Sequence, residues 1–216
     1  VNREGEGAQL IVGSSTGAMH VLECEGFRVV YLQAMDGNHS KPISDIASTH
    51  DTDMAELTYP PEELFAVADE GGVVSVWKAK GLAPCGRLEV PGECFTSVRL
   101  RAALALAATL AGKIFIFDIE SQAVKCEIAA HARAVCALAL HPSQPWLVSA
   151  SEDTFVNIWN LEGLEAREIE ALASKNLPDR MLCGAAFVGE GGKDVAVVHY
   201  DSESITMLIG DRVPGM

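Results

Sequence analysis

Residues 130–161 read AHARAVCALALHPSQPWLVSASEDTFVNIWNL, and this stretch decides the fold. It holds three short apolar runs, at residues 135–140, 146–153 and 155–161, and turn residues separate them. Such runs, rich in β-branched and aromatic residues, predict β-strands. We expect a fourth strand at about residues 165–171, which would complete the four-stranded unit of a β-propeller blade.

Weaker copies of this unit occur along the rest of the chain. They lie at residues 10–22, 64–78, 102–118 and 181–209, and residues 49–63 read as an insertion. The aromatic residues Trp77, Phe117 and Trp159 fall 40 and then 42 residues apart. An interval of this size is typical of one propeller blade.

The repeat predicts an all-β protein with about five propeller blades. We place the blades at about residues 8–35, 38–90, 94–128, 131–172 and 181–210, within one domain over residues 1–216. Both ends of the sequence fall inside blades, so we expect part of a seven-bladed ring that this chain does not close. Residues 102–111 and 164–176 have a local helical look. We still predict strands there, because burial between blades can outweigh propensity.

Two features of the unit carry a family resemblance. Ala130-His131 and Trp159-Asn160 stand where WD40 repeats show Gly-His and Trp-Asp, so the unit resembles a WD40 repeat. Residues 129–138, 151–159 and 182–187 look like the C-terminal part of the WD repeat-containing protein 54 family. This resemblance implies a cytosolic WD40 propeller without a known catalytic residue set, with further blades upstream in full-length members.

The same unit carries a candidate structural tetrad, formed by His131, Ser149, Asp153 and Trp159. We expect the histidine to reach the serine and the aspartate, while the indole N–H finds a buried acceptor. A hydrolase triad is the rejected alternative, because a nucleophile needs an exposed oxygen beside an oxyanion hole. We expect the other blades to lack a full tetrad, although His39 offers a second histidine at the matching place.

No metal or cofactor site is predicted. The six histidines never pair at helical spacing, and no cysteine lies two or three residues from another ligand. The acidic residues between 51 and 63 lack the spacing of a calcium loop. The glycine-rich stretches at residues 69–72 and 189–192 lie between strands, so they predict turns and not a phosphate cradle.

Charge and hydropathy restrict the partners. The formal net charge of −14 repels polyanions, so nucleic acid is not expected as a partner. The longest apolar run, at residues 102–112, is too short to cross a bilayer as a helix, and no membrane partner is expected. Six scattered cysteines favour a reducing, cytoplasmic compartment without disulfides.

The sequence therefore predicts a non-catalytic scaffold that binds other proteins or peptides, with the chain a candidate subunit of a larger complex. Propeller loops gather on two faces, which suits docking. Arg133, Glu152 and Thr154 are the candidate binding residues, because the repeat places them beside the tetrad with their side chains free. The alternatives are a structural subunit of a cytoskeletal or ciliary assembly, contacted through residues 49–63, and a propeller-type hydrolase or lyase.

Overall fold

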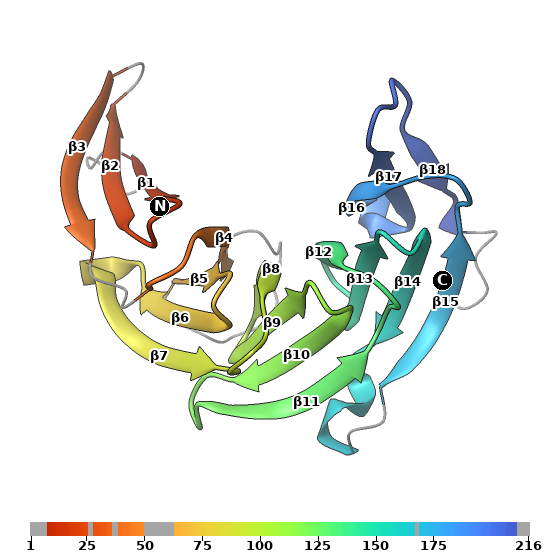
Figure 1. Cartoon of the computed structure of the whole chain (residues 1–216), viewed down its shortest axis with the longest axis horizontal. Helices are drawn as coiled ribbons and strands as arrows, with labels where there is room; N and C mark the ends of the chain where they lie inside the picture. Colours follow the sequence, from red (N-terminus) through yellow and green to blue (C-terminus); the bar gives the residue numbers. More distant parts are fainter. Residues whose placement is uncertain (1–7, 26–27, 36–38, 50–62, 167–168, 211–216) are drawn as a thin grey trace.

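The computed structural model describes residues 8–25, 28–35, 39–49, 63–166 and 169–210. These residues form five separate antiparallel sheets, numbered here as blades 1 to 5 in chain order. The sheets stand side by side along an open arc (Figure 1). This arrangement confirms the predicted all-β propeller class.

Blades 2, 3 and 4 are four-stranded, and in each the strands follow one another in sequence order. Their strands are β4 (Ile43–Ser48), β5 (Leu64–Asp69), β6 (Val73–Lys78) and β7 (Ala83–Glu89); β8 (Phe95–Arg101), β9 (Leu104–Thr109), β10 (Lys113–Asp118) and β11 (Ala123–Ala129); and β12 (Val135–Leu140), β13 (Trp146–Ser151), β14 (Phe155–Asn160) and β15 (Glu170–Asn176).

Blades 1 and 5 are three-stranded over the described residues. Their strands are β1 (Ala8–Gly13), β2 (Met19–Glu25) and β3 (Arg28–Met35), and β16 (Leu182–Val188), β17 (Asp194–His199) and β18 (Thr206–Leu208). Three short 3₁₀ turns, η2 (Lys80–Leu82), η3 (Glu162–Ala166) and η4 (Glu190–Gly192), join strands. No helix among the described residues is long and apolar enough to cross a membrane.

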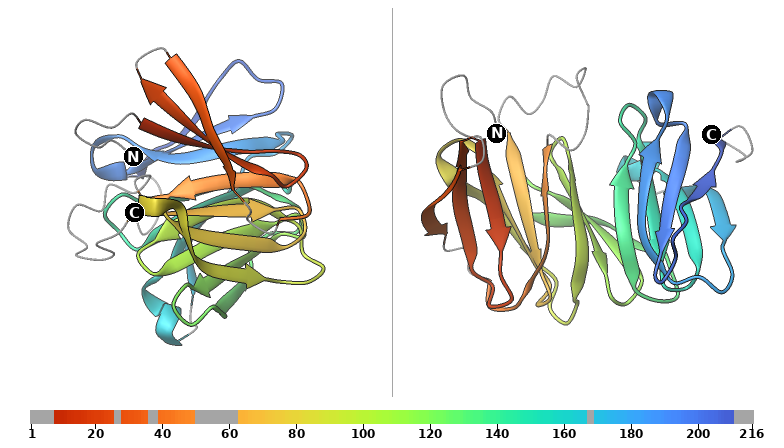
Figure 2. Two further views of the ribbon diagram at one scale, coloured as in Figure 1. Left: turned by 90° about the vertical axis from the view of Figure 1, so that its left-hand side faces the viewer. Right: turned by 90° about the horizontal axis from the view of Figure 1, so that it is seen from above.

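Each blade has an inner and an outer side. Strands β4, β8, β12 and β16 line the concave side of the arc, and β7, β11 and β15 lie on its convex side (Figure 1). Viewed from above, neighbouring sheets stand face to face in succession along the arc (Figure 2). Turns at the two strand ends therefore gather on two opposite faces of the molecule.

The middle strands of the full blades are buried on both faces, because a neighbouring sheet covers each face. All six residues of β5 are buried, as are the last five of β9 and of β13. A strand buried on both faces reads as a continuous apolar run without alternation. This burial explains why residues 102–111, despite their helix propensity, contain strand β9.

Two boundaries of blade 4 differ from the prediction. The fourth strand, β15, begins at Glu170 and not near residue 165. The 3₁₀ turn η3 occupies part of the expected strand, and it buries Leu164 against the core. The amphipathic pattern of residues 164–176 therefore does not form a helix: Leu164 is buried from a short turn, and a strand begins at Glu170. The predicted insertion at 49–63 lies outside the described residues except for its two ends.

The core consists of four apolar clusters, one at each junction between neighbouring blades. The junction of blades 2 and 3 also carries a charged contact on the inner strands. Oδ2 of Asp45 accepts hydrogen bonds from Oγ of Ser97 at 2.8 Å, from the backbone N–H of Val98 at 2.9 Å and from Nη1 of Arg99 at 2.8 Å. One carboxylate therefore ties β4 to β8.

The outward faces of the end blades are apolar and exposed. Leu10 and Tyr31 are 48% and 57% exposed on blade 1, and Val198 and Met207 are 40% and 45% exposed on blade 5. The two end sheets are not hydrogen-bonded to each other over the described residues. They lie at opposite ends of the arc, so this part of the chain does not close a ring (Figure 1).

Candidate functional site

The structure brings His131, Ser149, Asp153 and Trp159 together in blade 4. Nδ1 of His131 lies 3.1 Å from the carboxylate of Asp153, and its Nε2 lies 2.8 Å from Oγ of Ser149. The indole N–H of Trp159 donates to the same hydroxyl at 2.9 Å. One chain of hydrogen bonds thus links the loop before β12, strand β13, the following turn and strand β14.

Burial and bonding leave this network no catalytic freedom. Ser149 is fully buried, and the His131 side chain has no exposed surface. The Ser149 hydroxyl already accepts from the indole of Trp159 and lies in hydrogen-bond contact with His131. A nucleophile must reach a substrate carbonyl beside oxyanion donors, and this hydroxyl is enclosed between two strands. The arrangement therefore suits a structural role.

Burial also decides the charge state of the histidine. It lowers the pKa of His131 from 6.5, although attraction to Asp153 and the hydrogen bond that the ring N–H donates to this carboxylate act in the opposite direction. For Asp153, burial would raise the pKa. Hydrogen bonds from the backbone N–H groups of Ala132 and Phe155, together with His131, outweigh burial, and the pKa falls below 3.8. A neutral imidazole beside a carboxylate is the favoured state at neutral pH.

Blade 2 carries a second network that the sequence reading missed. Nδ1 of His39 lies 2.8 Å from Oδ2 of Asp69, and its Nε2 lies 2.7 Å from Oγ of Ser75. The indole N–H of Trp77 donates to Ser75 at 2.8 Å. The expectation that only blade 4 has a full tetrad is therefore wrong.

The register explains why the second network was missed. In blade 4 the serine is on β13 opposite Asn157 of β14, whereas in blade 2 Val67 takes the matching place on β5 and faces Ser75 on β6. The aspartate also moves, from the turn after β13 to the last residue of β5. Trp77 with a serine two residues earlier was the one available signal.

Blade 5 holds a shorter polar network at the corresponding place. Nε2 of His199 lies 2.8 Å from Oγ1 of Thr206, and Nη1 of Arg180 lies 3.0 Å and 2.7 Å from these two atoms. Arg180 precedes the inner strand β16, as His131 precedes β12. An arginine here takes the place of the imidazole, and no tryptophan closes the network.

The three predicted binding residues lie on one face, beside the tetrad turns, but their side chains are not free. Nη2 of Arg133 lies 3.2 Å from Oε2 of Glu152, forming an ion pair in which the Arg133 side chain is 66% exposed. Oγ1 of Thr154 donates to Oδ1 of Asn176 at 2.7 Å. The expectation of free side chains is therefore wrong: Arg133 and Glu152 pair with each other, and the end of β15 supplies a partner to Thr154.

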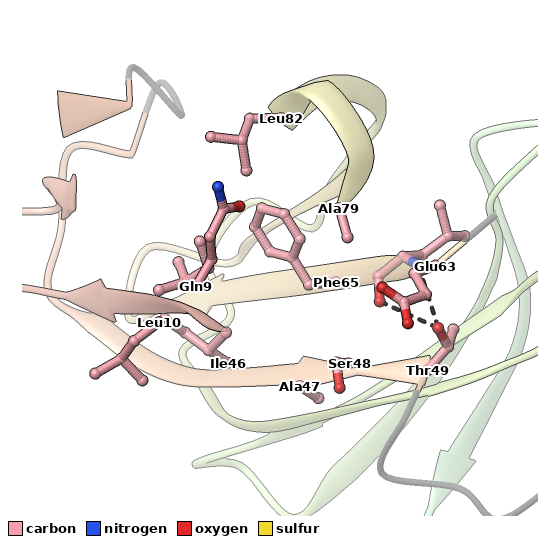
Figure 3. Close-up of a pocket in the computed structure, with 12 residues that line it drawn as sticks. Gln9, Leu10, Ile46, Ala47, Ser48, Thr49, Glu63, Phe65, Ala79 and Leu82 are labelled. Carbon is pink, nitrogen blue, oxygen red and sulfur yellow. Dashed lines mark hydrogen bonds between the residues drawn. The ribbon is translucent and has the colours of Figure 1, made fainter. Parts of the chain in front are cut away.

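A cavity of about 300 Å³ opens between blades 1 and 2 (Figure 3). Ile11 of β1, Ile46 of β4, Phe65 of β5 and Leu82 of η2 give it mainly apolar walls. The sequence reading did not point to this cavity. Its polar lining comes from Gln9, Ser48, Thr49 and Glu63.

Metal ligands do not converge anywhere in the part of the chain that the structure describes. No group of three or more His, Cys, Asp or Glu side chains gathers there in a way that could hold an ion. The acidic residues between 51 and 62, which were considered as a calcium loop, lie outside the described residues.

Comparison with known proteins places the chain in a family. A family model described as WDR54 matches residues 5–209. The chain is 32% identical over 202 residues to WD repeat domain 54 of Rattus norvegicus and 31% identical to WD repeat-containing protein 54 of Homo sapiens, each alignment covering 91% of this chain and 59% of the relative. A shorter match, 27% identical over 107 residues, covers 46% of this chain and 10% of the Bos taurus tRNA (34-2'-O)-methyltransferase regulator WDR6.

The chain therefore spans less than two thirds of the length of its WD repeat 54 relatives. The match nevertheless extends from the start of blade 1 to the end of blade 5. The resemblance seen in the His131 unit is thereby confirmed, and this chain belongs to the WDR54 family of WD repeat proteins.

Proposed function

We propose that this chain is a non-catalytic scaffold that binds other proteins or peptides through the face carrying Arg133, Glu152 and Thr154. The observation that carries the proposal is the tetrad itself, whose hydrogen-bonding groups are used internally to fix the turns on this face. Rigid turns hold exposed side chains in one geometry, which lowers the entropy cost of binding. Family membership supports the same role.

The ion pair of Arg133 and Glu152 supplies the polar part of the proposed surface. Both side chains are accessible, at 66% and 27% exposure, and surface ion pairs of this kind are weak enough to rearrange. A basic side chain of the partner could replace Arg133 on the Glu152 carboxylate, because charge-assisted hydrogen bonds stabilise such a pair. The overall charge of −14 favours protein partners with a basic surface over nucleic acid.

The test is affinity capture by the intact protein, followed by mass spectrometry and titration of the recovered partner. Glu152→Lys should weaken binding at least tenfold, because the new positive charge repels Arg133 and reverses the charge that this face presents at residue 152. Glu165→Lys is the matched control, since Glu165 lies in blade 4 at the opposite end of β14, where it pairs with Lys125 of β11 in blade 3. Equal binding by both variants would remove this face from the proposal.

A structural subunit of a cytoskeletal or ciliary assembly is the alternative within the same cytoplasmic setting. Its sequence support is the insertion at 49–63, most of which lies outside the described residues. Deletion of residues 50–62 distinguishes the two functions, because it should abolish incorporation into an assembly and leave a partner bound at the Glu152 face unaffected. A turnover screen against ester, peptide and phosphate substrates tests the hydrolase alternative, and no turnover is expected.

A further inference from the structure

Each inner strand from blade 2 to blade 5 contains one extra residue near its start. The pairing of the inner strand with the next strand shifts register there, and the four bulged positions are held by Ser44, Thr96, Cys136 and Cys183. A bulge leaves its extra residue out of the ladder and re-aims its side chain. All four residues carry a small hydroxyl or thiol group.

The equivalent contacts one blade earlier show what these side chains meet. Oγ1 of Thr96, on β8, lies 2.6 Å from the carbonyl oxygen of Val135, the residue directly before Cys136. Strand β12 packs against β16 as β8 packs against β12. In this comparison Cys136 corresponds to Thr96, and Leu182, the residue directly before Cys183, corresponds to Val135.

The two thiols also point the same way. Sγ of Cys136 donates to the carbonyl of Ala134, and Sγ of Cys183 donates to the carbonyl of Met181, so each bonds two residues back along its own strand. Cys183 is close enough to contribute to the raised pKa of Cys136, after burial and Glu152. The other four cysteines lie elsewhere, on β2, β7 and β11 and just before β8.

We infer that Cys136 and Cys183 form a dithiol site that small disulfides, of the class of glutathione disulfide, convert into a cross-link between blades 4 and 5. All six cysteines lie among the described residues, and none of them forms a disulfide. Cys183 is exposed and Cys136 is only partly so, which assigns the first step to Cys183. Exposure governs which thiol meets a reagent in solution.

The chemistry proceeds in two balanced exchanges. The Cys183 thiolate attacks one sulfur of glutathione disulfide, the S–S bond breaks, and one glutathione thiolate leaves. Cys136 then loses its proton to water, and its thiolate attacks the sulfur of Cys183. This step expels the second glutathione as thiolate and leaves the Cys136–Cys183 disulfide. Two protein thiols are oxidised, and one glutathione disulfide is reduced to two thiols.

The test treats the intact protein with glutathione disulfide and maps its peptides without reduction. The expected product is one peptide pair joined through Cys136 and Cys183, with a loss of two free thiols per molecule. Cys136→Ser should stop the reaction at a stable glutathione adduct on Cys183. Cys183→Ser should leave Cys136 unmodified over the same time. Serine suits both places, because Ser44 occupies the equivalent bulge in blade 2.

Cys126→Ser on β11 is the matched control, and it should form the cross-link as the parent does. The inference is overturned if the parent stops at a Cys183 adduct, if Cys136 pairs with another cysteine, or if links form only between molecules. Circular dichroism of each variant before treatment checks that the comparison is made between folded proteins.

Discussion

Blades 2 and 4 connect a histidine, an aspartate, a serine and a tryptophan by two different routes. In blade 4 the serine comes from β13 and the aspartate from the turn, whereas in blade 2 the serine comes from β6 and the aspartate from the end of β5. Val67 and Ser75 are direct cross-strand partners, as are Ser149 and Asn157. A hydroxyl on either member of such a pair can reach the histidine and the indole. The two networks therefore place the same groups together in space, although the residues stand at different places in the repeat.

The two routes leave the two carboxylates exposed to different degrees. The Asp69 side chain is 1% exposed and that of Asp153 is 11% exposed, while both histidines are fully enclosed. Asp69 also accepts backbone N–H bonds from Gly71 and Val73 through its other oxygen. Blade 2 therefore depends more strongly on its histidine, although blade 4 has the more recognisable motif.

Removing the histidines should produce the largest effects. We expect His39→Ala to lower the free energy of unfolding by about 3 kcal/mol, because it strands a buried carboxylate and the hydroxyl of Ser75. His131→Ala should cost about 2 kcal/mol, since water can reach Asp153. Urea unfolding of both variants provides the measurement. A larger loss for His131→Ala would reverse the proposed ranking of the two blades.

Moving the serine between strands tests whether the two routes are interchangeable. Ser75→Ala should cost about 1 to 2 kcal/mol, because the indole of Trp77 loses its acceptor. Adding Val67→Ser places a hydroxyl where blade 4 has Ser149, and it should recover about 1 kcal/mol in a double-mutant cycle. Val67→Ser alone supplies the fourth corner of the cycle. A coupling energy near zero would mean that the two positions do not reach the same space.

The unfolding free energy should fall as the pH drops below about 6.5. Burial lowers the pKa of His131 from 6.5, so below that pH the unfolded chain binds more protons than the folded protein. Stability is thus complete above 6.5 and is lost as the pH falls through the folded pKa. His131→Gln should flatten the profile, leaving the slope from His141, whose pKa is also lowered by burial and by Arg101. An unchanged profile in His131→Gln would contradict this assignment.

The smallest effect is expected at the turn after β13. Thr154 has a φ of 73°, where the turn after β5 has Gly72 with a φ of 82°. A threonine in this left-handed region costs on the order of 1 kcal/mol, so Thr154→Gly should stabilise the protein by up to about that amount. Thermal unfolding measures it. Gly72→Ala is the contrasting change, and it should destabilise the protein, since the new Cβ would clash with the carbonyl oxygen of Val90.

The sequence predicted the elements whose signals are local. Apolar runs at matched intervals located the blades, and the spacing of His131, Ser149, Asp153 and Trp159 predicted their meeting. The network of His39 was not predictable in the same way, because blade 2 has Val67 and Gly71 at the places where the template has its serine and aspartate. Ser75 does in blade 2 what Ser149 does in blade 4 because Ser75 is the cross-strand partner of Val67, and a single sequence does not display such pairing.

Contacts between exposed turns were also beyond the sequence. The repeat placed Arg133 and Glu152 near each other, but the ion pair depends on the orientation of the loop before β12 relative to the turn after β13. The partner of Thr154, Asn176, comes from the end of β15, whose start the sequence placed about five residues too early. With the strand predicted to end near residue 171, Asn176 was not expected beside Thr154.

The carboxylate of Asp45 has a consequence for how the protein opens. In an array of sheets that contact only their neighbours, each junction sets how tightly two units are coupled during local unfolding. Three donors from β8 converge on this one oxygen, so blades 2 and 3 cannot separate without exposing an unpaired charge and three unpaired donors. Blades 2 and 3 should therefore behave as one cooperative unit, and amide protons of β5 and β9 should exchange with solvent at the same rate-limiting opening.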